Sequence, residues 1–285
     1  MAAKYTLATK VKLRDGKEMP QIQLGLYMMS TKEAAQSVKA ALASGYRGFD
    51  CAQMYHNEQQ AGKAIRSFLQ SPEGAHLDRK DVFYTSKLAQ NSAEYEAVRR
   101  SITESVTVCG LGYIDLFLLH SPYGGTEARQ TSWQAVEDAI DAGEVRSGGV
   151  SNYGTKHIDE LTAVARIPPV VNQIEVHPFN TRADIRNACA KHDIIIEAYA
   201  PLVRGMRMSH PTIQKLAKRH GCTPAQLLVR WSLQHGLVPL PKSINKRRMT
   251  ENANVNGFVL SDQEMKMLND LDEYLVTDWD PTTTR

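Results

Sequence analysis

The chain has 285 residues, 42% of them hydrophobic and 23% charged, which fits a globular protein and excludes a disordered chain, a collagen or a coiled coil. Its 34 Lys and Arg residues against 31 Asp and Glu residues give a formal net charge of +3. This excess is too small to indicate binding to nucleic acid or to a membrane. Length alone allows one large α/β domain or two small ones.

The cysteine pattern and the N-terminal segment predict the cellular compartment. The four cysteines form no CxxC pair, which is typical of reduced thiols in an intracellular protein: Cys51, Cys109, Cys189 and Cys222. The first ten residues, MAAKYTLATK, lack the apolar stretch of a signal peptide. No run approaches the roughly 18 apolar residues of a membrane-spanning helix. We therefore expect a cytoplasmic protein whose core needs no disulfide or metal.

The first expected element is a β-hairpin. Residues 10–13 and 18–21 can form short strands on either side of Asp15 and Gly16. An Asp-Gly dipeptide suits a type I′ turn, because both central residues of that turn need a positive φ. The hairpin would precede the rest of the fold.

Eight short apolar runs then alternate with longer segments of helical pattern. The runs are mostly continuous, as in parallel strands that are buried on both faces: residues 23–26, 48–51, 82–86, 114–119, 147–150, 170–174, 194–198 and 238–241. The expected helices cover residues 31–43, 57–69, 93–109, 131–142, 155–164, 183–192, 211–219, 224–234, 247–254 and 262–271. Ser30 and Glu33 form a capping box at the start of the first. No change in composition divides the chain, so we expect a single domain over residues 1–285.

Eight β-then-α units in one domain predict an α/β protein with a (β/α)8 (TIM) barrel behind the N-terminal hairpin. The alternative is a doubly wound sheet. Against it, no G-x-G-x-x-G follows the first strand and no Walker A pattern occurs. In a barrel the reactive side chains lie at the C-terminal ends of the strands, so the residues that follow each apolar run are the candidates for a site.

Four residues of different chemistry occupy such positions. Asp50 and Tyr55 follow the second barrel strand, Lys87 follows the third and His120 follows the fourth. Each alone has an ordinary structural explanation, but their coincidence at corresponding strand ends favours function. A nearby ammonium lowers the pKa of a phenol, an aspartate keeps that ammonium charged in a partly dry pocket, and a neutral imidazole orients a carbonyl oxygen. This set suits acid-catalysed reduction of a carbonyl by hydride from a bound cofactor.

Longer segments resemble the signature blocks of the aldo-keto reductase family. Residues 45–65, GYRGFDCAQMYHNEQQAGKAI, are similar to the first family signature, and residues 114–122, IDLFLLHSP, resemble the segment that carries the family histidine. Further similarity lies in GEVRSGGVSN (143–152), VNQIEVHP (171–178) and PKSINKRRMTEN (241–252). The resemblance runs from about residue 13 to residue 271, which is nearly the whole chain.

The resemblance implies an NADPH-dependent carbonyl reductase in which Tyr55 is the proton donor and Asp50, Lys87 and His120 are its partners. It assigns the nicotinamide carboxamide to Ser151, Asn152 and Gln173, the nicotinamide ring to Tyr199, and the pyrophosphate to the loop from Ala200 to Leu202. It assigns the 2′-phosphate to Lys242, Ser243 and Arg248 and the adenine to Glu251 and Asn252. The remaining cofactor contacts would come from Met28, Asp50 and Ile244.

A Lys and an Arg six positions apart also make a sensible phosphate clamp on chemical grounds alone. Lys246, Arg247 and Arg248 form a basic run. Without the tyrosine set, an ordinary charged helix start would explain these residues equally well.

The chain departs from the family pattern near the substrate. The family usually has Gly-[Thr/Val]-Trp after the first strand, where this chain has Tyr27, Met28 and Met29. We expect the substrate pocket to be lined by Tyr27, Met29, Met54, His120 and Ser121, with Ser121 in the place of a frequent aromatic residue. The loop after His120 is short, and only about fourteen residues follow the last expected helix. These features predict an open pocket.

Two smaller departures occur in the signatures themselves. Gly48 precedes the Phe-Asp pair where the family prefers other small or apolar residues, and Ala200 stands where Ser is common. These changes bear on substrate preference and leave the predicted reaction type unchanged.

Three functions account for the barrel to different degrees. Reduction of aldehydes or activated ketones to alcohols with NADPH uses all four strand-end residues. A non-catalytic NADPH-binding regulatory subunit, a role that the fold serves in channel-associated relatives, would not need them intact. An isomerase of phosphorylated sugars would bind its phosphate at the basic clamp but leaves the Tyr–Lys pair without a role. We therefore expect a small-molecule carbonyl substrate, a monomer, and no nucleic-acid or membrane partner.

Overall fold

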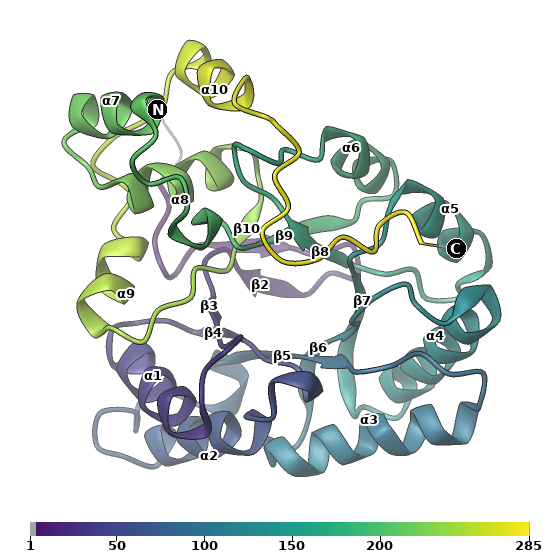
Figure 1. The fold of residues 1–285 in the computed structure, drawn as a ribbon. Coiled ribbons are helices and arrows are strands. Elements are labelled where there is room, and N and C mark those ends of the chain that lie inside the picture. Colours follow the sequence, from purple (N-terminus) through teal and green to yellow (C-terminus); the bar gives the residue numbers. More distant parts are fainter. Residues whose placement is uncertain (1–3, 285) are drawn as a thin grey trace.

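The computed structural model describes residues 4–284, which contain eight parallel strands that curl into one sheet surrounded by helices (Figure 1). The strands lie side by side in chain order: β3 (Leu24–Gly25), β4 (Gly48–Asp50), β5 (Phe83–Leu88), β6 (Ile114–Leu119), β7 (Val145–Ser151), β8 (Val171–Glu175), β9 (Ile195–Tyr199) and β10 (Val238–Pro239). The backbone amide of Gln23 donates to the carbonyl of Pro239 at 3.4 Å, which joins the first strand to the last. The predicted (β/α)8 barrel is confirmed.

Helices cover the outside of the barrel. They are α1 (Thr31–Ala43), α2 (Glu58–Leu69), α3 (Tyr95–Cys109), α4 (Gly125–Asp141), α5 (Thr155–Val164), α6 (Ala183–Lys191), α7 (Pro211–His220), α8 (Pro224–Gln234), α9 (Lys246–Ala253) and α10 (Asp262–Asn269). The predicted capping box of α1 is present, with Ser30 Oγ accepting from the Glu33 amide at 3.3 Å and a Glu33 carboxylate oxygen accepting from the Ser30 amide at 2.8 Å. Over residues 4–284, no helix has both the length and the apolar character needed to cross a membrane.

Helix α4 begins six positions before the predicted start at residue 131. Gly124 and Gly125 take φ values of 102° and 84°, which side chains other than glycine rarely adopt. The chain therefore turns sharply after the fourth barrel strand and enters the helix at once. Glycine is a poor helix former, which explains why the sequence pattern placed the helix start later.

The N-terminal hairpin forms as predicted, but its turn differs. Strands β1 (Lys10–Lys12) and β2 (Glu18–Pro20) pair antiparallel. Residues 13–17 join them, and the Leu13 amide donates to the Lys17 carbonyl within this loop. In this loop Gly16 takes a positive φ of 86°, whereas the expected type I′ turn needs a positive φ at Asp15 as well. The Asp15 carboxylate instead accepts from the Lys17 amide and from Ser147 Oγ.

The hairpin closes the N-terminal end of the barrel. It lies behind the sheet in Figure 1. Leu13 and Met19 from the hairpin pack in one buried apolar cluster with side chains of the barrel: Phe83, Leu116, Leu118, Val170, Val171, Val238 and Leu240. Because this floor is apolar and closed, polar side chains inside the barrel are restricted to the middle and to the C-terminal end.

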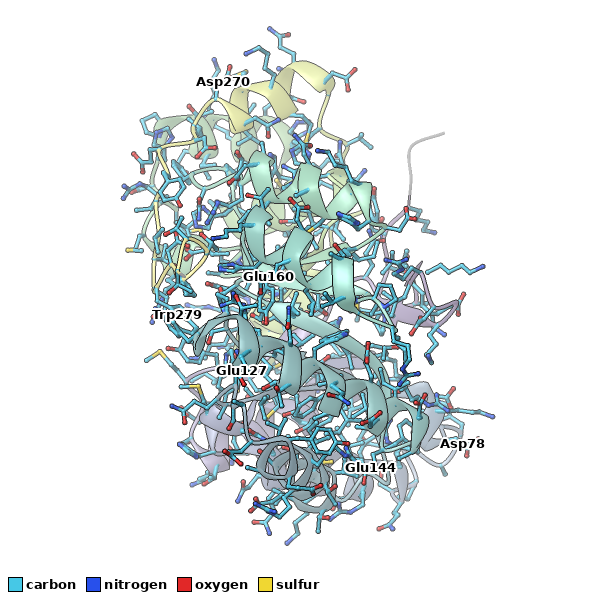
Figure 2. The ribbon with its side chains drawn as sticks, turned by 90° about the vertical axis from the view of Figure 1, so that its right-hand side faces the viewer. Asp78, Glu127, Glu144, Glu160, Asp270 and Trp279 are labelled. Carbon is cyan, nitrogen blue, oxygen red and sulfur yellow. The ribbon has the colours of Figure 1, made fainter. Side chains whose placement is uncertain are left out.

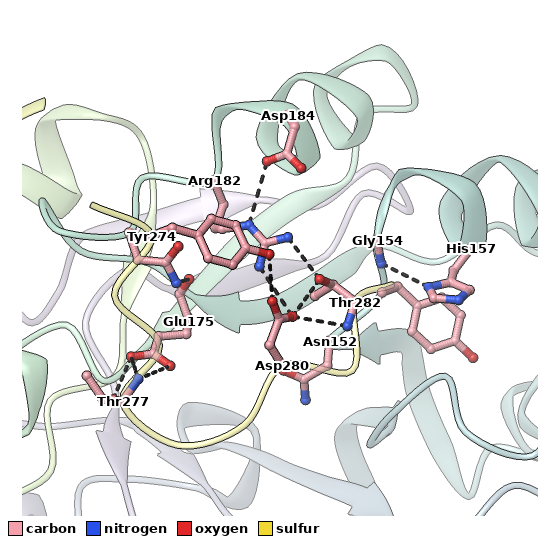
Figure 3. A network of polar contacts seen from close by, with 12 residues as sticks. Asn152, Gly154, His157, Glu175, Arg182, Asp184, Tyr274, Thr277, Asp280 and Thr282 are labelled. Carbon is pink, nitrogen blue, oxygen red and sulfur yellow. Dashed lines mark hydrogen bonds and ion pairs between the residues drawn. The ribbon is translucent and has the colours of Figure 1, made fainter. Parts of the chain in front are cut away.

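The segment after α10 crosses the C-terminal end of the barrel and is anchored there by Arg182 (Figure 3). Arg182 is 6% exposed. Its guanidinium donates to Thr282 Oγ1 at 2.9 Å, lies 3.5 Å from a carboxylate oxygen of Asp280, and stands 5.0 Å from the centre of the Tyr274 ring. These contacts fix three positions of the segment to the start of α6.

A second anchor brings an aromatic side chain to the mouth of the barrel. The Glu175 carboxylate at the end of β8 accepts from the Thr277 amide at 3.0 and 3.1 Å. Between the two anchors, the ring centre of Trp279 lies 6.2 Å from that of His120 and 5.7 Å from that of Tyr123.

The prediction of an open pocket is therefore wrong on this side of the mouth. Figure 2 shows Trp279 at the edge of the molecule opposite Asp78, which precedes β5 and so marks the N-terminal end of the strands. The C-terminal segment is short, as the sequence indicated, but its polar anchors hold it across the mouth.

Replacing Arg182 with Ala should release this segment. Hydrogen bonds to charged groups contribute about 1.5–3 kcal/mol each, and the variant loses those to Thr282 and Asp280. Trp133 and Trp231 are 2% and 0% exposed, so acrylamide quenching of tryptophan fluorescence reports mainly on Trp279. We expect quenching to increase clearly.

Arg166→Ala is the control, because Arg166 is an exposed arginine that pairs with Asp141 on the surface of α4. Acrylamide should quench the tryptophan fluorescence of Arg166→Ala to the same extent as that of the wild type. Wild-type quenching in Arg182→Ala would show that other contacts hold the segment.

Candidate active site

The four residues predicted at the strand ends meet around one ammonium group. Lys87, on β5, is 0% exposed. Its Nζ lies 2.8 and 2.9 Å from the two carboxylate oxygens of Asp50, 3.0 Å from the Tyr55 hydroxyl and 3.0 Å from the Cys51 carbonyl. An ammonium has three N–H groups and no acceptor, so these three partners use all of its donors.

Tyr55 is positioned by a short 3-10 helix, η1 (Gln53–Tyr55), directly after β4. The Gln53 side chain anchors this turn: its Oε1 accepts from the Ala89 amide at 2.7 Å, and its Nε2 donates to Ser105 Oγ at 2.9 Å and to Ser101 on α3. The turn is thereby fixed to the end of β5 and to α3, and the phenol is held against Lys87.

The pKa values of this pair show which protonation states the pocket favours. Burial raises the pKa of Tyr55 above its usual value, and the charge of Lys87 acts in the opposite direction without cancelling it. Burial lowers the pKa of Lys87, but the negative charge of Asp50 and the contact with Tyr55 outweigh it, so the net shift is upward. The resting pair is a neutral phenol beside a charged ammonium.

The sequence predicted a lowered pKa for Tyr55. Lys87 does act to lower the pKa of Tyr55, as predicted, but the net shift of that pKa is upward. The sequence showed the cation but not the depth of burial, which is the larger effect here.

His120 follows β6 and faces Tyr55 with a ring-centre distance of 5.8 Å. It is 9% exposed, and burial together with the charge of Lys87 lowers its pKa to about 3. Its Nδ1 is buried without a hydrogen-bond partner, and its carbonyl accepts from Asn152 Nδ2 at 3.0 Å. A neutral imidazole and a phenol therefore border the same space, where both can bond to one oxygen atom.

Four residues assigned to the nicotinamide lie together beside Asp50. Ser151 Oγ donates to the Gln173 carbonyl at 2.8 Å, and the Tyr199 hydroxyl donates to Asn152 Oδ1 at 2.9 Å. Gln173 Nε2 donates to Asp50 Oδ1 at 2.8 Å. Asn152 takes a positive φ of 61°, which sets its side chain between His120 and Tyr199. This cluster of amides and hydroxyls matches the hydrogen-bonding groups of a carboxamide.

The residues assigned to the phosphates lie at the rim after β10. Lys242, Ile244 and Arg248 are exposed, and Ser243 is 8% exposed. Lys242 Nζ donates to the Met28 carbonyl at 3.3 Å, which joins the loop after β10 to the loop after β3. Across residues 4–284, Lys242 and Arg248 form no ion pair. Two cations without acidic partners fit an anionic group.

The other residues assigned to the cofactor are spread along the same rim. Ala200 takes a positive φ of 47° after β9, and Leu202 is half-buried behind it. On α9, Asn252 is 4% exposed, whereas Glu251 lines a hollow of about 560 Å³ between α8 and α9. The structure thus puts Glu251 on the side of α9 that faces α8.

The residues assigned to the substrate pocket divide between rim and core. Tyr27 is 41% exposed and its ring centre lies 5.1 Å from that of Tyr55, while Met54 is 52% exposed. Ser121 is 7% exposed beside His120. Met29 is 4% exposed and packs in the main hydrophobic cluster. In the loop after β3, Tyr27 and not Met29 is therefore the side chain that lies at the rim of the barrel. A pocket role for Met29 remains a prediction.

Sequence reasoning missed several residues of the site. Trp279 and Tyr123 reach the mouth from segments without a strand or helix pattern, where only their aromatic character gave a signal. Gln53 lies in the segment of residues 45–65, and Glu197 lies in the apolar run of residues 194–198. The contacts of both residues depend on packing between segments that are distant in the sequence. Glu197 is a carboxylate within an apolar run, which is an unusual position for a charged residue and was the one available signal.

Comparison with known proteins identifies the family. Residues 21–273 match the Aldo/keto reductase family. The chain is 44% identical over 276 residues to an uncharacterised oxidoreductase of Schizosaccharomyces pombe, covering 96% of this chain and 98% of the relative. It is 36% identical over 269 residues to the glyoxal reductase of Bacillus subtilis, covering 94% of each chain.

Solved structures agree with the sequence comparison. The Bombyx mori aldo-keto reductase in complex with NADP has a TM-score of 0.87 and 31% identity, and the match covers 97% of this chain and 96% of that one. An aldo-keto reductase from a deep-sea metagenome library has a TM-score of 0.87 and 35% identity, covering 93% of this chain and 96% of that one. The chain belongs to the aldo/keto reductase family of oxidoreductases.

Proposed function

We propose that the protein reduces aldehydes and activated ketones to alcohols with NADPH, and that Tyr55 is the general acid. The observation that carries the proposal is the bond of 3.0 Å between the Tyr55 hydroxyl and the buried Lys87 ammonium, beside a neutral His120. The similarity to a glyoxal reductase supports a small carbonyl substrate. The single domain, the monomeric state and the cytoplasmic location remain predictions.

The residues of the site fit NADPH. Ser151, Asn152 and Gln173 offer groups for a carboxamide, and Gln173 has its amide hydrogens on Asp50 and Glu197, which leaves its amide oxygen to accept. Lys242 and Arg248 are exposed cations suited to a phosphate. The bound nicotinamide would supply the hydride, and the NADP complex of the silkworm relative supports this choice of cofactor.

The side chains of this protein would bind and protonate the substrate oxygen. The carbonyl oxygen would accept hydrogen bonds from Tyr55 and His120, and the Tyr55 proton would pass to it as negative charge develops. Lys87 would stabilise the phenolate that remains, since its ammonium already contacts that oxygen. His120, with its pKa lowered to about 3 by burial, is neutral at physiological pH. It would therefore orient the oxygen and not supply the proton.

Tyr55→Phe should abolish most of the turnover and leave the cofactor site intact. The substitution removes the proton and keeps the ring, and general acid catalysis contributes roughly 10²–10⁴-fold to a rate. We expect kcat for 4-nitrobenzaldehyde to fall by about that factor, measured as the loss of NADPH absorbance. NADPH affinity, measured by fluorescence titration, should stay the same.

Tyr113→Phe is the matched control, because Tyr113 precedes β6 at the N-terminal end of the barrel and its ring stacks with Arg79 and Arg146. It should keep wild-type turnover. Near-normal reduction by Tyr55→Phe with tight NADPH binding would refute the assignment.

Arg248→Ala should weaken the binding of NADPH and leave NADH almost unaffected. A guanidinium can meet the 2′-phosphate with two parallel hydrogen bonds, and we expect its loss to cost roughly 1.5–3 kcal/mol in total, the range for a hydrogen bond to a charged group. We expect the NADPH dissociation constant to rise about ten- to a hundredfold. The preference of the wild type for NADPH should also decrease with added salt, because an exposed contact is screened.

Fluorescence titration of both cofactors tests this prediction. Arg247→Ala is the control, since it removes the same charge one position earlier on α9. Equal losses for NADPH and NADH in Arg248→Ala, or no loss for either, would mean that the 2′-phosphate binds elsewhere.

A further inference from the structure

A second carboxylate lies inside the barrel below the pair formed by Lys87 and Asp50. Glu197 is on β9 and is 0% exposed. Side chains two positions apart on a strand share a face, and Ile195 and Tyr199 both pack against the apolar floor. Glu197 therefore points into the barrel, with apolar side chains beneath it.

Glu197 is joined to the reacting groups by an unbroken series of hydrogen bonds. Gln173 Nε2 donates to Glu197 Oε2 at 2.8 Å and to Asp50 Oδ1 at 2.8 Å. Asp50 in turn binds Lys87, which binds the Tyr55 hydroxyl. A change of charge at Glu197 is thus transmitted through one amide to the carboxylate that holds Lys87.

The charges around Glu197 favour its neutral form. The titratable and charged groups that face it are Asp50 from β4, Lys87 from β5 and, beyond Lys87, Tyr55; Gln173 from β8 and Gln23 from the first strand region are uncharged. Lys87 is already balanced by Asp50, so an ionised Glu197 would be an unbalanced negative charge. Burial and the charge of Asp50 raise the pKa of Glu197 to about 7.

Gln23 provides the acceptor that a protonated Glu197 needs. Its Nε2 lies 2.8 Å from Glu197 Oε1, while its own Oε1 is buried without a partner. The two orientations of an amide have nearly the same shape. Turning this amide over places its oxygen against Glu197 Oε1, where it can accept the proton of the acid.

Gly48 explains how Gln23 reaches this position. A Cβ atom at Gly48 would lie 2.5 Å from Gln23 Cγ, so a larger residue would displace the Gln23 side chain. Gly48 is also one of the positions where the sequence departs from the family pattern. The departure leaves the space through which Gln23 contacts Glu197.

We propose that Glu197 is a positioning residue that, as a neutral acid, holds Gln173 and Asp50 in place and, when ionised, weakens proton donation by Tyr55. On ionisation the O–H bond of Glu197 breaks and its proton passes to the solvent. The added negative charge makes the loss of a proton from Tyr55 less favourable. This proposal rests on the proposed function, in which Tyr55 is the proton donor.

The kinetic test is the pH profile of reduction by Glu197→Gln. Glutamine keeps the shape and the hydrogen bonds of the neutral acid but does not ionise. We expect kcat of the wild type to fall severalfold as the pH rises through about 7, where Glu197 ionises. In Glu197→Gln this decrease should be absent, with KM changed less than twofold.

Glu58→Gln is the matched control. Glu58 lies on α2, outside the barrel interior, and its carboxylate accepts from Ser86 Oγ on β5. Burial also raises the pKa of the Glu58 carboxyl. This variant should keep the pH profile of the wild type. A purely structural role for Glu197 would instead lower the activity of Glu197→Gln by the same factor at every pH, and that result would overturn the proposal.

Unfolding measurements test the protonation of Glu197 without using activity. Its pKa in the folded protein is above the ordinary value of 4.5, so the folded state binds this proton more tightly than the unfolded state. The stability that this adds is complete below about pH 4.5 and is lost as the pH rises towards 7. Between about pH 5 and about pH 8, the unfolding constant in urea should rise roughly a hundredfold more in the wild type than in Glu197→Gln.

The two measurements separate this proposal from the proposed function. If the wild type reduces no carbonyl compound but the pH-dependent stability difference is found, the function fails and the neutral state of Glu197 stands. If the wild type is an active reductase and Glu197→Gln matches it in the pH dependence of both kcat and stability, the role of Glu197 is overturned.

Discussion

The ammonium of Lys87 is a full charge in the interior of the barrel, and the neighbouring residues are arranged to keep it there. An isolated buried charge costs several kcal/mol, which only a well-placed counter-charge and complete hydrogen bonding can offset. Asp50, Tyr55 and the Cys51 carbonyl supply that compensation from one adjacent strand and its loop. The parallel pairing of β4 with β5 sets this spacing, because the carboxyl ends of neighbouring strands come to the same edge.

The rest of the structure depends on confining that charge to one end of the barrel. The hairpin and the apolar floor close the N-terminal end, so the polar groups around Lys87 lie toward the C-terminal end. There the anchored C-terminal segment places Trp279 beside His120. Burial is also why His120 stays neutral and why Tyr55 keeps its proton in the resting state.

The sequence predicted the parts of the fold that depend on local pattern. Continuous apolar runs located every barrel strand to within about two residues, and strand ends brought Asp50, Tyr55, Lys87 and His120 together as expected. Local pattern could not predict the features that arise from contacts between segments that are distant in the sequence. The path of the C-terminal segment depends on Arg182, whose partners lie about a hundred positions away, and the net pKa shift of Tyr55 depends on burial that no spacing reveals. Glu197 falls in the same class, since it contacts Gln23, which precedes β3, and Gln173 on β8.

In the proposed mechanism, Lys87 supports the loss of a proton from Tyr55, and Asp50 holds Lys87 in place. The most direct measurement is the pH dependence of single-turnover carbonyl reduction in Lys87→Met and Asp50→Asn beside the wild type. Removing the cation raises the pKa of Tyr55 further. Lys87→Met should therefore react far more slowly, and the part of its pH–rate profile that reports the ionisation of Tyr55 should move to higher pH. Asp50→Asn should show a smaller effect in the same direction. An unchanged pH profile in Lys87→Met would show that Lys87 does not support proton loss from Tyr55.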